Sequence, residues 1–325
     1  MCPKLPKKVY RYQCFSKWTL QALVHDKLYF SDPSSFNDPF DCKPTVRSDA
    51  DRDILRKILE NLIIRRVESE TTASLSKAKL NGEKSNQYAE RIGKQAAQNE
   101  ILNLEYHATN PDYEGSTYEN ECWLLTNEIE RELLKRYDRG ICCFSTSFKN
   151  PLLWSHYGEQ HNGICIGYNI ERKPVPVLQK VQYGGNRIIN TSLIEKAILR
   201  NDKVSQEILD QNILLRKAPP WKYEGEWRLF GNRGVHDSPL ALKDITFGLR
   251  CPIEIIHSVV SALENRTLKI DFFKTYEVPG EFELKRREVD IDEMKAFFPR
   301  TAMSGEEIFG PVIDSELIKP NKKKA

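Results

Sequence analysis

The sequence predicts a mixed α+β fold: one elaborated domain that carries a helical insertion. Two observations predict it. Short apolar segments of strand length alternate with helical segments, and a long polar stretch with helical spacing interrupts them. With 325 residues, 40% of them hydrophobic, the chain can bury a substantial core. We expect a single domain over residues 1–290, the insertion at about 45–135, and a partly flexible C-terminal extension over 291–325.

The N-terminal segments read as a strand, a helix and a second strand. Residues 9–15 alternate as a strand does, and 17–26 has helical spacing with Ser16 placed as its N-cap. Residues 28–30 form a short strand. The loop at 31–41 that follows is rich in Asp, Asn, Ser and Pro, which favour turns.

The insertion is marked by a change of composition. From 49 to 106 charged and polar residues dominate, and apolar residues recur at helical spacing between 54 and 63. We interpret this stretch as a long helical hairpin, with a further helix over 119–137.

The second half of the chain alternates more regularly. We expect strands at 140–145, 163–168, 178–183, 223–231, 242–247 and 267–274, and helices at 151–160, within 191–217 and at 252–263. Beyond residue 289 the chain should wrap around the domain or extend from it. The sequence has no Gly-rich phosphate loop, so it gives no support to a Rossmann or P-loop fold.

Charge and composition exclude several functions. The net charge is only +3, so electrostatics gives no case for nucleic-acid or membrane binding. The N-terminus lacks the apolar core of a secretory signal, and no apolar run approaches the ~20 residues that span a bilayer. The eight cysteines include no C-x-x-C pair. We therefore expect a cytoplasmic protein with reduced cysteines and no metal site.

The first candidate segment is Tyr10-Arg11-Tyr12 on the first expected strand. Alternation along a strand puts Arg11 on the face opposite the two tyrosines. An inward guanidinium needs an anion, because an unpaired buried charge is costly, and phosphate suits its planar fork. The alternatives are that Arg11 faces solvent or pairs with a core carboxylate.

The second candidate segment runs from 142 to 161. Three hydroxyls at 145–147 lie at a strand end, where they can orient a polar ligand. Trp154 and Tyr157 are one helical step apart and could flank a flat ring. His156 and His161 are five residues apart, a poor spacing for metal ligation, and both could be structural.

The third candidate segment is 221–228, which is rich in aromatic and acidic residues. On a strand, Glu224, Glu226 and Arg228 would share one face. Two carboxylates two residues apart repel each other and can raise one pKa, as is common at functional sites. Gly225 leaves room for a ligand or for backbone. The alternative is a solvated edge strand with an Arg–Glu pair.

Six ordered motifs connect these segments to a known family. They are Tyr10-Arg11-Tyr12, residues 36–41, Cys143-Phe144-Ser145, Trp154-x-His156-Tyr157, residues 163–168 and Tyr223-Glu224-x-Glu226-Trp227-Arg228. Together they resemble DUF2971, a bacterial family of unknown function. The likeness covers roughly residues 8–280 and implies no activity.

A second resemblance does imply an activity. An arginine on the first strand, then Ser145-Thr146-Ser147, then Glu224-Gly225-Glu226 is similar to the arginine-class (R-S-E) ADP-ribosyltransferases. The resemblance implies a split, mostly antiparallel β core. It also implies that Arg11 holds the phosphates of NAD, that Ser145 braces the site, and that Glu226 is the catalytic carboxylate, assisted by Glu224.

NAD would then be the substrate. Breaking its nicotinamide–ribose bond develops an oxocarbenium-like cation, which a preorganised carboxylate stabilises. The other residues that we expect around NAD are Tyr10, Ser147, Trp154, His156 and Tyr157. The acceptor could be a protein, a nucleic acid, a small molecule or water. A toxin or phage-defence role is an expectation from this class of activity.

Two other function classes stay open. A nuclease or another hydrolase, with or without a metal, could use His156, His161 and Glu226 as acid and base without NAD. Metal or nucleic-acid dependence would identify it. A non-catalytic ligand-sensing or interaction module could use the aromatic residues for binding alone, and its ligand binding would survive Glu226→Gln.

Overall fold

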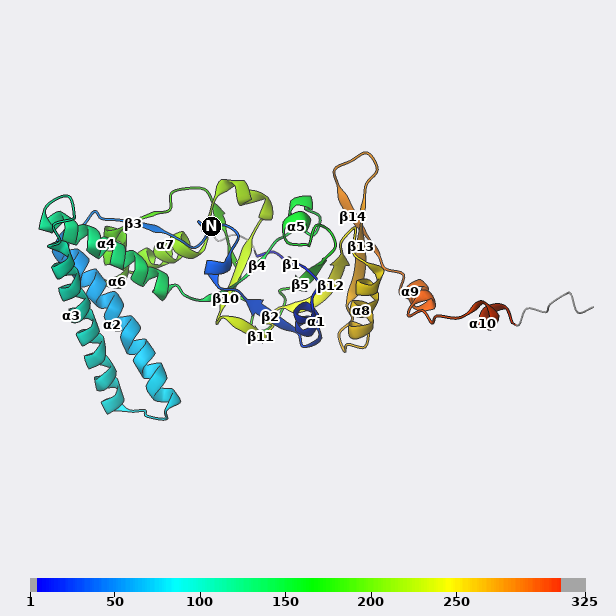
Figure 1. Cartoon of the computed structure of the whole chain (residues 1–325), viewed down its shortest axis with the longest axis horizontal. Coiled ribbons are helices and arrows are strands. Elements are labelled where there is room, and N and C mark those ends of the chain that lie inside the picture. The colour runs from blue at the N-terminus through cyan, green and yellow to red at the C-terminus, as the bar shows by residue number, and fades with distance from the viewer. Residues whose placement is uncertain (1–4, 311–325) are drawn as a thin grey trace, which may run out of the picture.

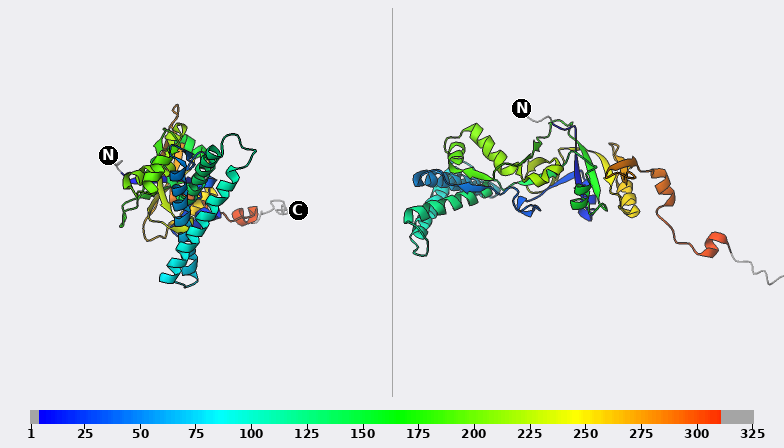
Figure 2. Two further views of the ribbon diagram at one scale, coloured as in Figure 1. Left: turned by 90° about the vertical axis from the view of Figure 1, so that its left-hand side faces the viewer. Right: turned by 90° about the horizontal axis from the view of Figure 1, so that it is seen from above.

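A computed structural model describes residues 5–310, and over that range the predicted mixed α+β class is confirmed. The molecule is elongated: a helical hairpin projects at one end, the sheets lie in the middle, and the last helices extend from the other end (Figures 1 and 2). The strands are β1 (Lys8–Gln13), β2 (Lys27–Phe30), β3 (Thr45–Arg47), β4 (Gly140–Phe144), β5 (Ile164–Asn169), β6 (Gln179–Lys180), β7 (Gln182–Tyr183), β8 (Ile188–Asn190), β9 (Arg216–Lys217), β10 (Trp227–Gly231), β11 (Gly234–Asp237), β12 (Ala241–Phe247), β13 (Asp271–Glu277) and β14 (Leu284–Glu288). The helices are α1 (Lys17–Val24), η1 (Pro33–Ser35), α2 (Arg52–Lys77), α3 (Glu83–Ala108), α4 (Thr117–Arg136), α5 (Pro151–His156), α6 (Thr191–Ile198), α7 (Lys203–Leu214), η2 (Pro219–Glu224), α8 (Ile253–Leu263), α9 (Ile291–Phe297) and α10 (Gly305–Phe309).

The largest sheet has five strands in the order β1-β5-β12-β13-β14. Its pairs are antiparallel except for β12 and β13, which run parallel. One face packs against α8, where Val259 and Val260 join Ile245 and Phe247 in a buried cluster. On the other face a smaller cluster joins the tyrosines of β1 to α5 through Trp154. Burial on both faces explains why β5 is almost wholly apolar.

A second, three-stranded sheet lies beside the first, in the order β4-β10-β6. Among residues 5–310 the two sheets are connected by an isolated bridge, in which Tyr10 and Ser145 exchange both backbone hydrogen bonds at 2.8 Å. A second bridge, Ser31 to Ile141, attaches β2 to β4. Residues of β1 and β4 on either side of this junction line a cavity.

Helices α2, α3 and α4 occupy the range in which we expected an insertion, and they belong to a hydrophobic cluster separate from those of the five-stranded sheet. Asp51 caps α2, and Ser116 caps α4 in a capping box with Glu119. The apolar stripe of α2, with Leu55 and Leu59 wholly buried, packs against α3 and α4. Helices α6 and α7 join the same cluster, although they lie far along the chain. The sequence did not predict this second packing partner, because helical periodicity shows which face is buried but not against what.

Several element boundaries differ from the prediction. Residues 223–226 are not a strand: η2 ends at Gly225, whose φ of +54° is left-handed, and β10 begins only at Trp227. The helix expected at 151–160 ends at His156, because residues 159–161 all have positive φ. Strands β3, β8, β11 and β14 were not predicted, and β9 lies within a range that we expected to be helical. Of the expected C-terminal extension, 291–310 forms α9 and α10, and 311–325 lies outside the described residues.

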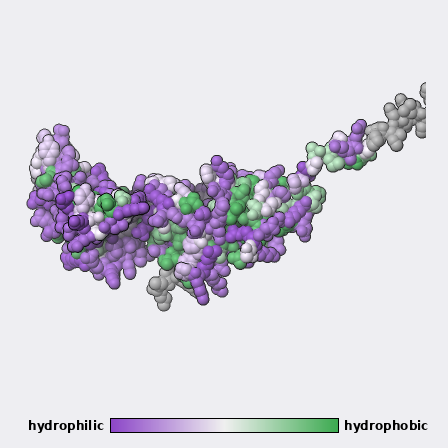
Figure 3. All heavy atoms as spheres, turned by 90° about the horizontal axis from the view of Figure 1, so that it is seen from below, coloured by the Kyte–Doolittle hydropathy of each residue, from purple (hydrophilic) through white to green (hydrophobic). Residues whose placement is uncertain are grey.

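The surface differs between the two ends of the molecule. Figure 3 shows mostly hydrophilic side chains over the helical end and hydrophobic ones gathered over the β half. In the part of the chain that the structure describes, no helix combines the length and apolarity needed to cross a bilayer.

Candidate functional site

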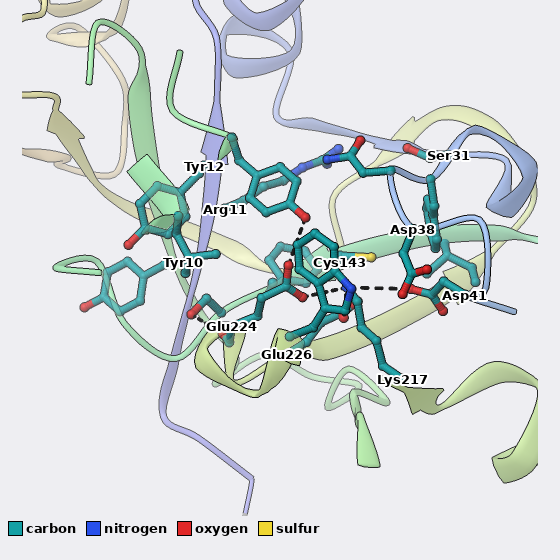
Figure 4. A pocket seen from close by; sticks show the side chains of 18 of the residues that line it. Tyr10, Arg11, Tyr12, Ser31, Asp38, Asp41, Cys143, Lys217, Glu224 and Glu226 are labelled. Atoms are coloured by element: carbon teal, nitrogen blue, oxygen red, sulfur yellow. Dashed lines mark hydrogen bonds and ion pairs between the residues drawn. The ribbon is translucent and has the colours of Figure 1, made fainter. Parts of the chain in front are cut away.

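A cavity of about 270 Å³ lies at the junction of the two sheets (Figure 4). Its walls come from β1, the loop after β2, β4, the end of α5, and the segment from β9 to β10. The side chains that line it and carry polar groups are Tyr10, Arg11, Tyr12, Ser31, Ser35, Asn37, Asp38, Asp41, Cys143, Ser145, Tyr157, Lys217, Trp221, Glu224 and Glu226. Segments separated by more than a hundred residues thus contribute to one site.

Arg11 lies in the middle of β1 with its guanidinium turned to the cavity wall (Figure 4). Its Nη1 donates to Sγ of Cys142 at 2.9 Å, and its Nη2 donates to the carbonyl of Tyr29 at 3.1 Å. Within residues 5–310 no carboxylate forms an ion pair with it, which removes the alternative of a core carboxylate partner. Its two hydrogen bonds are to a thiol and a carbonyl, so they leave the positive charge of the guanidinium without an anionic partner among the described residues.

Ser145 ends β4 and fixes the turn that carries the two glutamates. Its Oγ donates to the carbonyl of Glu224 at 2.6 Å across 79 residues of sequence, and it accepts the backbone N–H of Ser147. The amide of Asn150 reinforces this contact by donating to the carbonyl of Tyr223 at 2.8 Å. These two contacts connect the end of β4 and the start of α5 to the turn at Glu224.

Glu226 is buried in a network of cations. Nε of Arg228 donates to its Oε1 at 2.7 Å, and Nζ of Lys217 lies 3.0 Å from its Oε2. Arg228 also pairs with Asp41 at 2.6 Å and is itself 0% exposed. Burial acts to raise the pKa of Glu226, but the two cations outweigh it and lower that pKa to about 2. This carboxylate is thus permanently ionised.

Glu224 has different surroundings, two residues away. The hydroxyl of Tyr157 donates to its Oε1 at 2.9 Å, and Lys217 pairs with its Oε2 at 2.6 Å. Here burial dominates and raises the pKa of Glu224, with Lys217 opposing and Glu226 reinforcing the shift. Two neighbouring carboxylates with pKa values pushed apart are a usual sign of divided acid and base roles.

Three charged residues of the cavity were not among the predicted site residues: Lys217, Asp38 and Asp41. Lys217 forms ion pairs with both glutamates and also lies 3.6 Å from Asp41. Its sequence signal was weak, a lysine between an apolar helix and Pro219. The two aspartates belong to a loop that the sequence marked only as a turn, although it was one of the recognised motifs.

Several predicted site residues lie away from the cavity. Trp154 is 0% exposed, donates through Nε1 to the carbonyl of Phe148, and packs edge-on against Tyr12, so it cannot flank a ligand with Tyr157. This difference arises because the helix turns Trp154 into the sheet. Ser147 does not line the cavity; its Oγ accepts the backbone N–H of Lys149.

The histidines also lie outside the cavity. His156 is exposed and stacks on Tyr223 with ring centroids 6.3 Å apart. His161 stacks on Trp154 instead, and burial lowers its pKa. The hydrolase alternative requires both histidines to lie beside Glu226. In the structure they do not. Nowhere in residues 5–310 do three His, Cys, Asp or Glu side chains gather in a way that could hold a metal ion.

Comparison with known proteins adds one match, and it falls on this site. No curated protein and no solved structure matches the chain. Residues 153–229 match the profile of a family described as protein of unknown function (DUF2971). The matched range includes Tyr157, Lys217, Glu224 and Glu226 but not Arg11 or Ser145. Over these residues, from α5 to β10, the chain is thus similar to DUF2971, as the motifs indicated.

Proposed function

We propose that this protein cleaves the nicotinamide–ribose bond of NAD, either as an ADP-ribosyltransferase or as an NAD glycohydrolase. One observation carries the proposal: Arg11, Ser145 and the Glu224–Glu226 turn meet around one cavity, although they are distant in sequence. These are the three elements that the ADP-ribosyltransferase resemblance requires, in the required order.

The charges of the cavity favour this ligand. Four acidic side chains line it, at 38, 41, 224 and 226, against the two cations Arg11 and Lys217. An acidic interior suits the positively charged nicotinamide ring and the oxocarbenium-like sugar that forms when the bond breaks. Arg11, which has no carboxylate partner, suits the pyrophosphate.

The sizes of this cavity and of a neighbouring one fit one orientation of NAD across the site. About 270 Å³ is less than the ~300–1,000 Å³ typical of sites that enclose a whole drug-sized ligand. Arg11 also borders a second cavity of about 590 Å³, beside α1 and β2, lined by Trp18 and Tyr29. A dinucleotide could therefore place its nicotinamide riboside in the first cavity, its phosphates at Arg11 and its adenosine in the second.

The two glutamates then have separate roles. Glu226, ionised and fixed by Arg228, would stabilise the developing cation without reorganisation. Glu224, whose pKa is raised, would take the proton of the attacking acceptor or water. Tyr157 and Lys217 would orient Glu224 through its two oxygens.

The test is release of nicotinamide from NAD by the purified protein, with cell lysate as a source of acceptors. Glu226→Gln and Glu224→Gln should each abolish most of the release. The matched control is Glu132→Gln, which removes an equally buried, ion-paired carboxylate from the helical insertion. No release from the folded wild-type protein, with or without lysate, would refute the proposal.

One feature favours a second candidate function, a ligand-binding module that has no catalytic activity. Both oxygens of Glu226 already accept hydrogen bonds from cations. If that network is only structural, NAD or a related cation should bind to the cavity tightly but remain intact. Calorimetric binding of NAD without nicotinamide release would support this candidate over the enzyme.

A further inference from the structure

Asp38 has an unusual position in the cavity wall. The residue is 8% exposed, and its Oδ1 accepts the backbone N–H of Phe40 at 2.9 Å. Its other oxygen, Oδ2, is buried and has no hydrogen-bond partner within residues 5–310. Figure 4 shows the side chain on the cavity surface, beside Asp41.

The contrast with Asp41 makes this arrangement informative. Asp41 Oδ2 is paired with Arg228 at 2.6 Å and lies 3.6 Å from Lys217, whereas Asp38 has no cation within ion-pair distance in the described part of the chain. A buried polar atom without a partner costs about 1–3 kcal/mol, and more when it is charged. An acceptor kept in this state at a cavity wall is suited to a donor that a ligand brings.

The chemistry of the ligand identifies the donor. A carboxylate oxygen only accepts, so it needs an O–H or N–H group. In the proposed reaction the reacting ribose must lie against Glu226, and Glu226 shares the cations Arg228 and Lys217 with the loop that carries Asp38. The hydroxyls of that ribose are the donors that the substrate would bring to this part of the cavity. Carboxylates bind ribose hydroxyls in the same way in dinucleotide sites.

We propose that Asp38 binds a hydroxyl of the ribose next to nicotinamide and thereby selects ribosides over deoxyribosides. This inference rests on the proposed function for the identity of the ligand. Since Oδ2 has no hydrogen-bond partner among the residues that the structure describes, it can accept from one hydroxyl or from two vicinal ones. A deoxyriboside would leave the oxygen unpaired in the complex, which penalises binding.

The experiment uses nicotinamide riboside and its 2′-deoxy counterpart as probes, titrated calorimetrically into the full chain. Neither probe carries a phosphate, so Arg11 does not contribute. The variant is Asp38→Asn, which keeps the acceptor for Phe40 N–H and replaces only the unpaired oxygen. The control is Asp32→Asn in the same loop, which keeps its cap on Ser34 and does not line the cavity.

Wild type should bind the riboside about 10- to 100-fold more tightly than the deoxyriboside, the range for one hydrogen bond to a charged group. Asp38→Asn should lose this discrimination, and Asp32→Asn should keep it. Equal affinities of wild type for the two probes, or full discrimination by Asp38→Asn, would overturn the inference. So would a failure of the wild type to bind either probe.

Nicotinamide release from NAD, measured on the same protein preparations with cell lysate as a source of acceptors, separates this inference from the proposed function. Discrimination that depends on Asp38 but comes without release would leave the riboside site standing and refute the cleavage. Release with equal affinity for both probes would support the cleavage and refute the role of Asp38.

Discussion

Replacing Glu226 by glutamine should destabilise the protein strongly near neutral pH, and this cost has to be known before any loss of activity is interpreted. The substitution removes the anion between Arg228 and Lys217 while keeping the shape of the side chain. Within residues 5–310, the fully buried Arg228 would keep only Asp41 as a charged partner. An uncompensated buried cation cannot recover its hydration without opening the core.

Two separate estimates give the loss of unfolding free energy that we expect for Glu226→Gln. Breaking a buried ion pair costs about 3–5 kcal/mol. The pKa of Glu226 falls from its ordinary 4.5 to about 2, a change equivalent to about 3 kcal/mol. Because the folded pKa is the lower one, this stabilisation is fully present above pH 4.5 and is lost as the pH falls from there towards 2. The two estimates agree.

The assay is urea unfolding of wild type and Glu226→Gln at neutral pH and at a series of acidic pH values. The difference in unfolding free energy should be largest at neutral pH and should shrink through the acidic range. Glu224→Gln is the internal contrast: the raised pKa of Glu224 means that its ionised form opposes folding above pH 4.5, so its pH dependence should have the opposite sign. A difference for Glu226→Gln below about 1 kcal/mol, or one that does not change with pH, would refute the reasoning.

Three further predictions follow from the site. Ser145→Ala should cost about 1 kcal/mol in unfolding free energy and slow nicotinamide release, because the turn at Glu224 loses its 2.6 Å bond; unchanged release would show that the brace is dispensable. Arg11→Met should raise the KM for NAD about tenfold or more but leave nicotinamide riboside binding intact, as calorimetry with both ligands can check. Trp154→Ala should lower the unfolding free energy by about 3–5 kcal/mol, a core effect that thermal denaturation separates from ligand binding; a stable variant would contradict its burial.

The sequence predicted the fold best where local periodicity decides it. The strand over 242–247 and the helix over 252–263 are close to β12 and α8, because alternation and helical spacing are properties of the segment itself. Strand β14 was missed because its residues are mostly polar: only Leu284 is buried and the strand pairs at a sheet edge. The end of α5 depends on left-handed residues that no propensity marks.

The sequence predicted only part of the candidate site. Arg11, Ser145 and Glu226 were found because their order along the chain resembles a family, which needs no knowledge of packing. Lys217 and Asp38 were missed because their roles arise from contacts between distant segments. Trp154 was misassigned because a tryptophan near polar residues has the same sequence signal whether it faces a ligand or the core.

The junction of the two sheets has a consequence for motion. One wall of the cavity is built on the five-stranded sheet and the other on the three-stranded sheet, and the Tyr10–Ser145 pair connects them. A small rotation about this pair would change the gap between Arg11 and Glu224 while each sheet kept its own hydrogen bonds. We therefore expect ligand binding to protect the backbone amides of Tyr10 and Ser145 from hydrogen exchange more than those within either sheet.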